Sequence, residues 1–214
     1  MMREGGGMIS ATGLFPQTVC AAAGRLNGKA FPHWTPVTVG RVRALVSYRL
    51  NDREHERRAE VGLGAMTSPD VLRLLIALPL GERVWSGVLT SADRRRLRRL
   101  GDGSVVSEGP ELLRLAVPAV EAGIALVAAG SWRQGLEAAG RFTPFCVRAI
   151  VLRRKPRDME ALRLEADFYG IGVIVADGFG QDGPSVLVPP APFVRERVSV
   201  GGWLFLEQLY ATIL

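Results

Sequence analysis

Apolar runs alternate with segments of helical periodicity over the second half of the chain. Three runs are almost wholly apolar, namely 121–129, 145–152 and 170–177, and such runs are typical of strands buried on both faces. The two segments between them, 132–142 and 156–169, place apolar residues at helical spacing. Strands that alternate with helices of this length predict a parallel α/β layer, and a further short strand is expected at 185–188.

The middle of the chain has a different pattern, with two helix starts followed by two short strands. Ser68-Pro-Asp70 is a strong helix start for the apolar segment 71–78, because serine caps and proline suits the first turn. Thr90-Ser-Ala-Asp93 caps a second helix, 94–100, which Gly101 ends. Residues 104–107 and 112–117 are predicted to be strands joined by a turn at Glu108-Gly-Pro.

The first third of the chain gives weaker signals. Residues 1–36 are rich in Gly, Ala and Pro, with a short helix expected at 16–26 and a loop at 31–36. Residues 37–49 fit both periods in part, and a helix capped by Thr38 fits slightly better than a strand. The mixed charge run 51–58 is typical of a solvated helix face or a loop.

The segment Trp203–Leu214 is predicted to be an amphipathic helix. Trp203, Leu206, Leu209 and Tyr210 fall on one apolar stripe, with Glu207, Gln208 and Thr212 outside it. Such a stripe must be covered, either by the core of this chain or by another molecule, so the helix is also a candidate surface for a homodimer or a protein partner.

Composition and charge narrow the classes of function. The chain has 214 residues, is 48% hydrophobic and carries a formal charge of +6 with a pI of about 10.1. A sizeable core is therefore feasible, and an anionic partner such as nucleic acid is favoured. The two cysteines are far apart without histidine spacing, so neither a metal site nor a cofactor is expected. No segment is apolar enough to span a membrane, which predicts a cytoplasmic protein.

The order of helix, short element, arginine-rich helix and hairpin over 69–117 resembles a winged helix-turn-helix. In such a module the second helix of the pair lies in the major groove of duplex DNA. The resemblance implies DNA contact by the arginines of that helix, and a second basic run follows the 145–152 strand. The expected nucleic-acid-binding residues are Arg94, Arg95, Arg96, Arg98, Arg99, Arg153, Arg154 and Lys155.

The stretch from 123 to 152 resembles the central βαβ of the PD-(D/E)XK, or restriction-endonuclease-like, superfamily. It contains a buried strand, then Trp132, an amphipathic helix with Gln134 and Phe142, and a second buried strand. Active members carry Glu-x-Lys on the first strand to bind Mg²⁺. The matching positions here are Leu126 and Ala128, so the resemblance implies a three-layer α/β core without catalytic or metal-binding residues.

The sequence thus predicts an α/β protein, α+β overall, in three segments: an N-terminal segment 1–66, a winged-helix-like module 67–118 and a nuclease-like domain 119–214. The favoured function is DNA binding by a catalytically inactive nuclease-like protein in regulation or in a DNA-processing or defence assembly. One alternative is a scaffold that mediates protein–protein interaction. The other is a metal-dependent nuclease with a displaced site at Glu108, Glu111 or Glu121.

Overall fold

The chain passes from one structural unit to a second and back. The computed structural model describes residues 15–26, 30–101, 103–176, 183–194 and 197–214. Unit 1 comprises Met1–Arg49 and Ala122–Val194, and unit 2 comprises Leu50–Glu121 and Arg195–Leu214. Both units mix helices and strands, so the predicted mixed α/β class is confirmed.

Unit 1 is built on a six-stranded mixed sheet with the order β1-β2-β6-β7-β8-β9. Strands β6, β7 and β8 are parallel, whereas β1 pairs with β2 and β8 with β9 in antiparallel fashion. The parallel strands are the three apolar runs of the sequence, and they occupy the interior of the sheet as their composition requires. The strands are β1 (His33–Val39), β2 (Val42–Leu50), β6 (Val120–Ala129), β7 (Val147–Leu152), β8 (Gly172–Val175) and β9 (Ser185–Val188).

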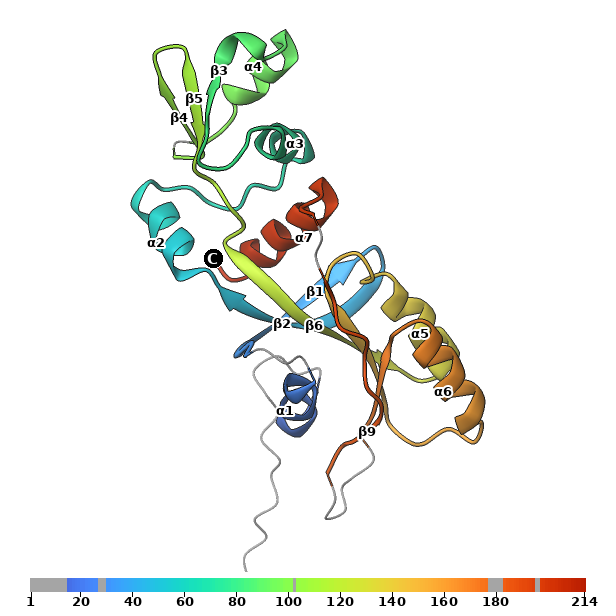
Figure 1. Cartoon of the computed structure of the whole chain (residues 1–214). Helices are drawn as coiled ribbons and strands as arrows, with labels where there is room; N and C mark the ends of the chain where they lie inside the picture. The colour runs from blue at the N-terminus through green and yellow to red at the C-terminus, as the bar shows by residue number, and fades with distance from the viewer. Residues whose placement is uncertain (1–14, 27–29, 102, 177–182, 195–196) are drawn as a thin grey trace, which may run out of the picture. The chain divides into compact units, whose positions relative to one another are not determined.

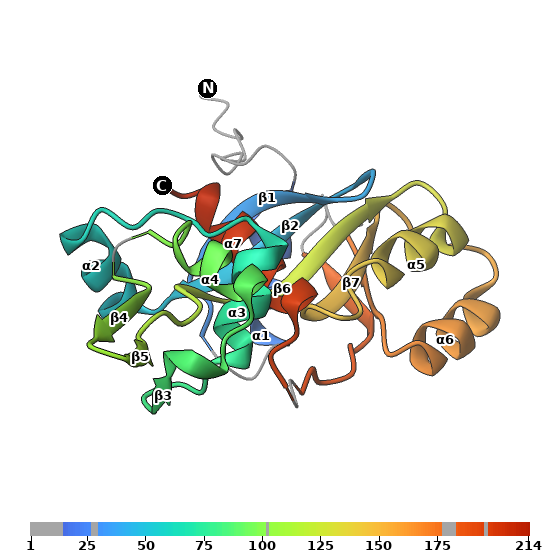
Figure 2. The ribbon, with the colours of Figure 1, turned by 90° about the horizontal axis from the view of Figure 1, so that it is seen from above.

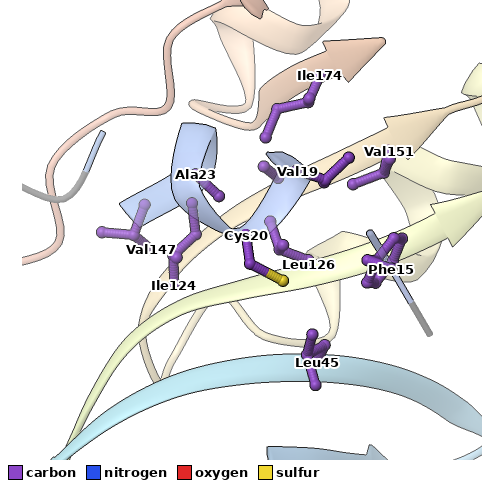
Figure 3. Close-up of a cluster of buried hydrophobic side chains, with 11 residues drawn as sticks. Phe15, Val19, Cys20, Ala23, Leu45, Ile124, Leu126, Val147, Val151 and Ile174 are labelled. Carbon is purple, nitrogen blue, oxygen red and sulfur yellow. The ribbon is translucent and has the colours of Figure 1, made fainter. Parts of the chain in front are cut away.

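Helices cover both faces of this sheet (Figure 1). Helix α1 (Gln17–Arg25) covers one face with Val19, Cys20 and Ala23. Alternate residues of the central strands meet it, and Figure 3 shows Leu126 of β6 among them. Helices α5 (Trp132–Gly140) and α6 (Met159–Phe168) contact β7 and β8. Unit 1 therefore has three layers, with helix, sheet and helices in turn.

The β6–α5–β7 connection packs closely because of one glycine. A Cβ atom at Gly135 of α5 would lie 2.6 Å from the Cβ of Ala129 and 3.2 Å from a methyl group of Ile150. These distances are shorter than ordinary van der Waals contact, so α5 approaches the sheet as closely as it does only with glycine there. Figure 2 shows α5 alongside β6 and β7.

Unit 2 combines helices with a small three-stranded antiparallel sheet of the order β3-β5-β4. Its core contains Leu72 and Leu75 of α3 together with Trp203 of α7, and α3 packs against both α4 and α7. The elements are α2 (Asp52–Glu60), α3 (Pro69–Ala77), β3 (Arg83–Trp85), the short 3-10 helix η1 (Ser86–Val88), α4 (Ser91–Leu97), β4 (Val105–Glu108), β5 (Glu111–Arg114) and α7 (Val200–Ala211).

The expectation of a helix at 37–49 and a loop at 31–36 is wrong. These residues form the β1–β2 hairpin, and Thr38 lies within β1 rather than at a helix start. The turn is Gly40-Arg41, with a positive φ of 61° only at Gly40, as in a type II′ hairpin turn. Pro36 is tolerated because β1 is an edge strand of the sheet.

The division into units also differs from the three consecutive segments that the sequence predicts. The hairpin 33–50 supplies two strands to the sheet of the nuclease-like segment, whereas α7 packs on α3 and so belongs to unit 2. Both rearrangements depend on contacts between residues far apart in the chain, which local patterns do not encode. Among the described residues, no helix is long and apolar enough to cross a membrane.

We predict that Leu126→Ala lowers the free energy of unfolding by about 3 kcal/mol, because it opens a cavity in the core beneath α1. Leu126 is 0% exposed. The matched control is Leu164→Ala on α6, where the side chain is 74% exposed and the change should stay within about 0.5 kcal/mol. Urea denaturation measures both, and equal effects of the two substitutions would contradict this placement of Leu126.

Candidate nucleic-acid interface and its buried support

Helix α4 is defined at its start by a side-chain cap. The Thr90 hydroxyl accepts a hydrogen bond from the backbone N–H of Asp93 (3.1 Å) and donates to the Asp93 carboxylate (2.6 Å). This confirms the predicted N-cap. The Thr90 hydroxyl and then the Arg96 guanidinium lower the pKa of Asp93, so its carboxylate is charged at neutral pH. Leu100, just beyond the helix, packs against the core of unit 2.

The five arginines of this region divide into two kinds. Arg96 is engaged: its Nη1 lies 2.8 Å from Asp93 Oδ1 and its Nη2 lies 3.6 Å from Asp70 Oδ1 of α3. The other four are exposed, and within the described part of the chain their side chains form no ion pair or hydrogen bond. They are Arg94, Arg95, Arg98 and Arg99.

These four guanidinium groups concentrate positive charge at one end of α4. Arg98 is the C-terminal cap of the helix and Arg99 follows in the next turn. The helix dipole favours cations at a helix C-terminus, and this offsets part of the repulsion among the four guanidinium groups. Exposed guanidinium groups without internal partners can form bidentate hydrogen bonds with phosphate oxygens.

The second predicted basic run lies in unit 1. Arg153, Arg154 and Lys155 are exposed in the loop that leaves β7 at its carboxyl end and leads to α6. They belong to a different unit from α4, so the sequence prediction that groups them with the α4 arginines stays a prediction.

The hairpin β4–β5 carries carboxylates rather than basic groups near its turn. Glu108 and Glu111 face each other in the strand register, and Arg83 of β3 forms ion pairs with both. Trp85 lies opposite Glu111 and is exposed on the same surface. The side chains of Arg83, Glu108 and Glu111 on this small sheet therefore carry a net negative charge.

A buried arginine forms the support of unit 2, although the sequence predicts a solvated face there. Arg58 of α2 is 0% exposed and all five of its N–H donors have acceptors. Its Nε donates to Glu54 (2.8 Å), and its two terminal nitrogens donate to the two carboxylate oxygens of Glu207 (2.8 and 2.7 Å). The remaining two donors bond to the carbonyl oxygens of Gly64 and Val117.

Glu207 of α7 is matched as completely as Arg58. One carboxylate oxygen also accepts from the Trp203 indole N–H (2.8 Å), and the other accepts from the backbone N–H of Met66 (2.8 Å). Glu54 in turn binds Arg57 through two hydrogen bonds of 2.8 Å. Two carboxylates and two guanidinium groups make this cluster neutral, which is the arrangement that burial of charge requires.

The cluster shifts the pKa values of Glu54 and Arg58 in the directions that favour their charged forms. Burial acts to raise the pKa of Glu54, but hydrogen bonds from Arg57 and Arg58 outweigh it and the pKa is lowered. Burial acts to lower the pKa of Arg58, but the Glu207 and Glu54 carboxylates outweigh it and the pKa is raised. Both groups are therefore charged at neutral pH.

Helix α7 is held in place by this cluster and by a second arginine. The Arg114 guanidinium lies over the Trp203 ring, 4.7 Å from its centroid, and donates to the carbonyl oxygens of Leu75 and Leu78 at the end of α3. Trp203 is buried in the core of unit 2, and the buried Tyr210 contacts His55 and Arg58 of α2. The prediction that Glu207 lies outside the apolar stripe is wrong, whereas Gln208 and Thr212 are exposed as expected.

The sequence contained a signal for this cluster. Glu207 is the only carboxylate or cation in the mostly apolar segment 200–211, and a carboxylate in such a helix needs a buried partner. Glu54 and Arg58 are spaced i, i+4 on α2. What the sequence does not give is the pairing of Arg58 with a residue 149 positions away.

The positions that resemble the catalytic strand of nucleases lie in different surroundings. Leu126 is buried beneath α1, in contact with the hydrophobic cluster of unit 1, and Ala128 is exposed near the end of β6. A metal-binding carboxylate at Leu126 would lie inside this core. Among the described residues, no group of three or more His, Cys, Asp or Glu could hold a metal ion.

Comparisons of this chain with protein-family models, with curated proteins and with solved structures give no match.

We predict strong coupling between Arg58 and Glu207. Arg58→Met should lower the free energy of unfolding by about 3–5 kcal/mol, because it leaves Glu207 buried without its counter-charge. Arg58→Met with Glu207→Gln should cost less than the sum of the single changes, by at least about 1 kcal/mol. In the exposed pair Arg73–Asp70, Arg73→Met should change stability by less than about 0.5 kcal/mol. Additive effects at Arg58 and Glu207 would show that the two side chains do not interact.

We also predict that the stability of unit 2 falls at acidic pH through Glu54. Its pKa in the folded protein lies below the ordinary 4.5, so its contribution is present above about pH 4.5 and is lost as the pH falls through the lowered pKa. Glu54→Gln should be less stable than the wild type at pH 7, and the difference should shrink toward pH 3. Urea titrations across this range measure it. A difference that stays constant with pH would contradict the role given to this carboxylate.

Proposed function

We propose that this protein binds duplex DNA through the exposed arginines of α4 and the turn that follows it. The observation that carries the proposal is the set of four arginines without internal partners, Arg94, Arg95, Arg98 and Arg99, in a helix whose fifth arginine is paired. Solubility alone is served by charges of both signs, whereas four adjacent guanidinium groups favour a row of phosphates.

The order of elements in unit 2 supports this proposal. A helix (α3), a strand (β3), the arginine-bearing helix (α4) and a hairpin (β4–β5) follow one another, and β3 pairs with β5. This is the order of a winged helix, in which the helix before the hairpin enters the major groove. We infer that α4 takes that position, and that the acidic hairpin tip at Glu108 and Glu111 stays away from the phosphates.

Unit 1 is proposed to be a nuclease-like layer without catalysis. The parallel β6–α5–β7 arrangement supports the resemblance to the restriction-endonuclease-like core, and Leu126 and Ala128 offer no ligand for a metal. Arg153, Arg154 and Lys155 are proposed as further phosphate contacts of this unit. The protein would then bind DNA without cutting it, as a regulator or as a subunit of a DNA-processing assembly.

The test is charge reversal on α4. We predict that Arg95→Glu with Arg99→Glu weakens binding to a labelled duplex by about 10–100-fold at roughly 50 mM salt, because two phosphate contacts become repulsive. The melting temperature should not change, since both side chains are exposed and unpaired. Fluorescence anisotropy measures the affinity, and the DNA recovered after incubation with Mg²⁺ should be intact.

The matched control is Arg41→Glu with Arg43→Glu, two exposed arginines of the β1–β2 hairpin, which changes the net charge equally. This pair should weaken binding by no more than about threefold, as a general charge effect. Equal loss in both variants would mean that net charge alone attracts DNA, and the assignment to α4 would be wrong. Cleavage of the DNA would contradict the proposal and favour the alternative of a metal-dependent nuclease with a displaced site.

A further inference from the structure

Helix α6 presents an apolar face to solvent. Leu164 is 74% exposed and Phe168, one helical turn further on, is 81% exposed, more than any other large apolar side chain in the described part of the chain. Tyr169 is also exposed and meets the Phe168 ring edge to face at 5.0 Å between centroids. The three side chains form one patch, the α6 patch, and Figure 2 shows α6 outermost in unit 1.

The fold of unit 1 does not require the α6 patch. The inner face of α6 is supplied by Leu162 and Ala166, which are fully buried toward the sheet. Leu164 and Phe168 lie on the opposite side, at the i, i+4 spacing at which two side chains of a helix touch. A helix that has already buried one apolar stripe gains nothing from a second one in water, so the second stripe is suited to a partner.

The charged side chains of α6 itself are mostly negative, and one cation from outside the helix, Arg148 of β7, donates to the carbonyl oxygen of Tyr169. On an α-helix, Glu160 and Asp167 border Leu164 on one side and Glu165 borders Phe168 on the other, with Arg163 as the one cation of the helix. Three carboxylates and one guanidinium give this helix a net charge of −2 in a protein whose overall charge is +6. None of these four side chains has an ion pair within the described residues.

We propose that the α6 patch docks an amphipathic helix of a partner protein, with apolar side chains bordered by Lys or Arg. Apolar contact would come from Leu164, Phe168 and Tyr169, and the acidic borders would select a basic partner. DNA is not suited to this face because its phosphates would meet carboxylates. A symmetric contact with a second copy of this chain is not suited either, because it would bring a second helix of charge −2 against the same charge. The α6 patch is independent of α4, so this inference does not rest on DNA binding.

The test uses a synthetic peptide as the probe. An amphipathic helix of about 18 residues made of Leu and Lys is long enough to be helical when bound. We expect wild-type protein to bind it at least tenfold more tightly than Leu164→Ser with Phe168→Ser, measured by fluorescence anisotropy. Val88→Ser with Leu214→Ser removes two apolar side chains elsewhere that are each 66% exposed, and this variant should bind the peptide as the wild type does.

A second pair of measurements tests the charge preference. Glu160→Lys with Asp167→Lys should weaken binding of the Leu/Lys peptide and strengthen binding of a Leu/Glu peptide of the same pattern. A small fall in melting temperature is expected, because Glu160 lies in the first turn of α6, where the helix dipole disfavours a cation. Three results would overturn the proposal. These are equal binding by the wild type and the Leu164/Phe168 variant, equal binding of the two peptides by the wild type, and a wild-type dimer in sedimentation that Leu164→Ser with Phe168→Ser dissociates.

Discussion

The burial of one guanidinium group sets the architecture of unit 2. Removing an ion from water costs several kcal/mol, and the cost is offset only when every donor is matched and the charge is balanced. Arg58 meets that condition with acceptors from α2, from the carbonyls of Gly64 and Val117, and from Glu207 of α7. Three stretches of the chain, α2 with the residues that follow it, Val117, and α7, must therefore converge on one point.

This constraint explains why the last segment of the chain returns to unit 2. Helix α7 is apolar on nearly every side and would be covered by any large core, but Glu207 restricts it to a place where a buried cation is available. Arg114 adds a second restriction by contacting the Trp203 ring and the end of α3. Helix α3, held in this way, packs against α4. The four unpaired arginines of α4 and of the turn after it are exposed to solvent.

Elements with strong local signals could be predicted from the sequence, and those determined by distant partners could not. The parallel strands follow from continuous apolar runs, and Ser68-Pro69 and Thr90 mark the starts of α3 and α4. The imperfect alternation of 37–49 favours a helix, whereas the strands of the β1–β2 hairpin depend on pairing within a larger sheet. For the same reason, local sequence predicts a solvated face at Glu54 and Arg58, because the partner Glu207 lies 149 residues from Arg58.

The sequence identifies the arginines of the candidate interface, but it does not indicate which of them have partners within the protein. Sequence patterning identifies five arginines between 94 and 99, and the structure separates Arg96, tied to Asp93 and Asp70, from the four without partners. The same distinction applies to the hairpin, where Arg83 is neutralised by two glutamates and so is removed from the basic surface. Net charge therefore overstates the number of cations that are free to bind an anionic partner.

The dependence of DNA affinity on salt tests this account most directly. Each phosphate neutralised by a cation releases condensed counterions, so the slope of log K against log salt counts the contacts. Four free arginines on α4 and the turn after it predict a slope of at least about −3 to −4 for the wild-type protein on duplex DNA, and the contacts proposed for Arg153, Arg154 and Lys155 would steepen it toward about −6. A slope near zero, or no measurable binding at low salt, would contradict the claim that these arginines form a phosphate-binding surface.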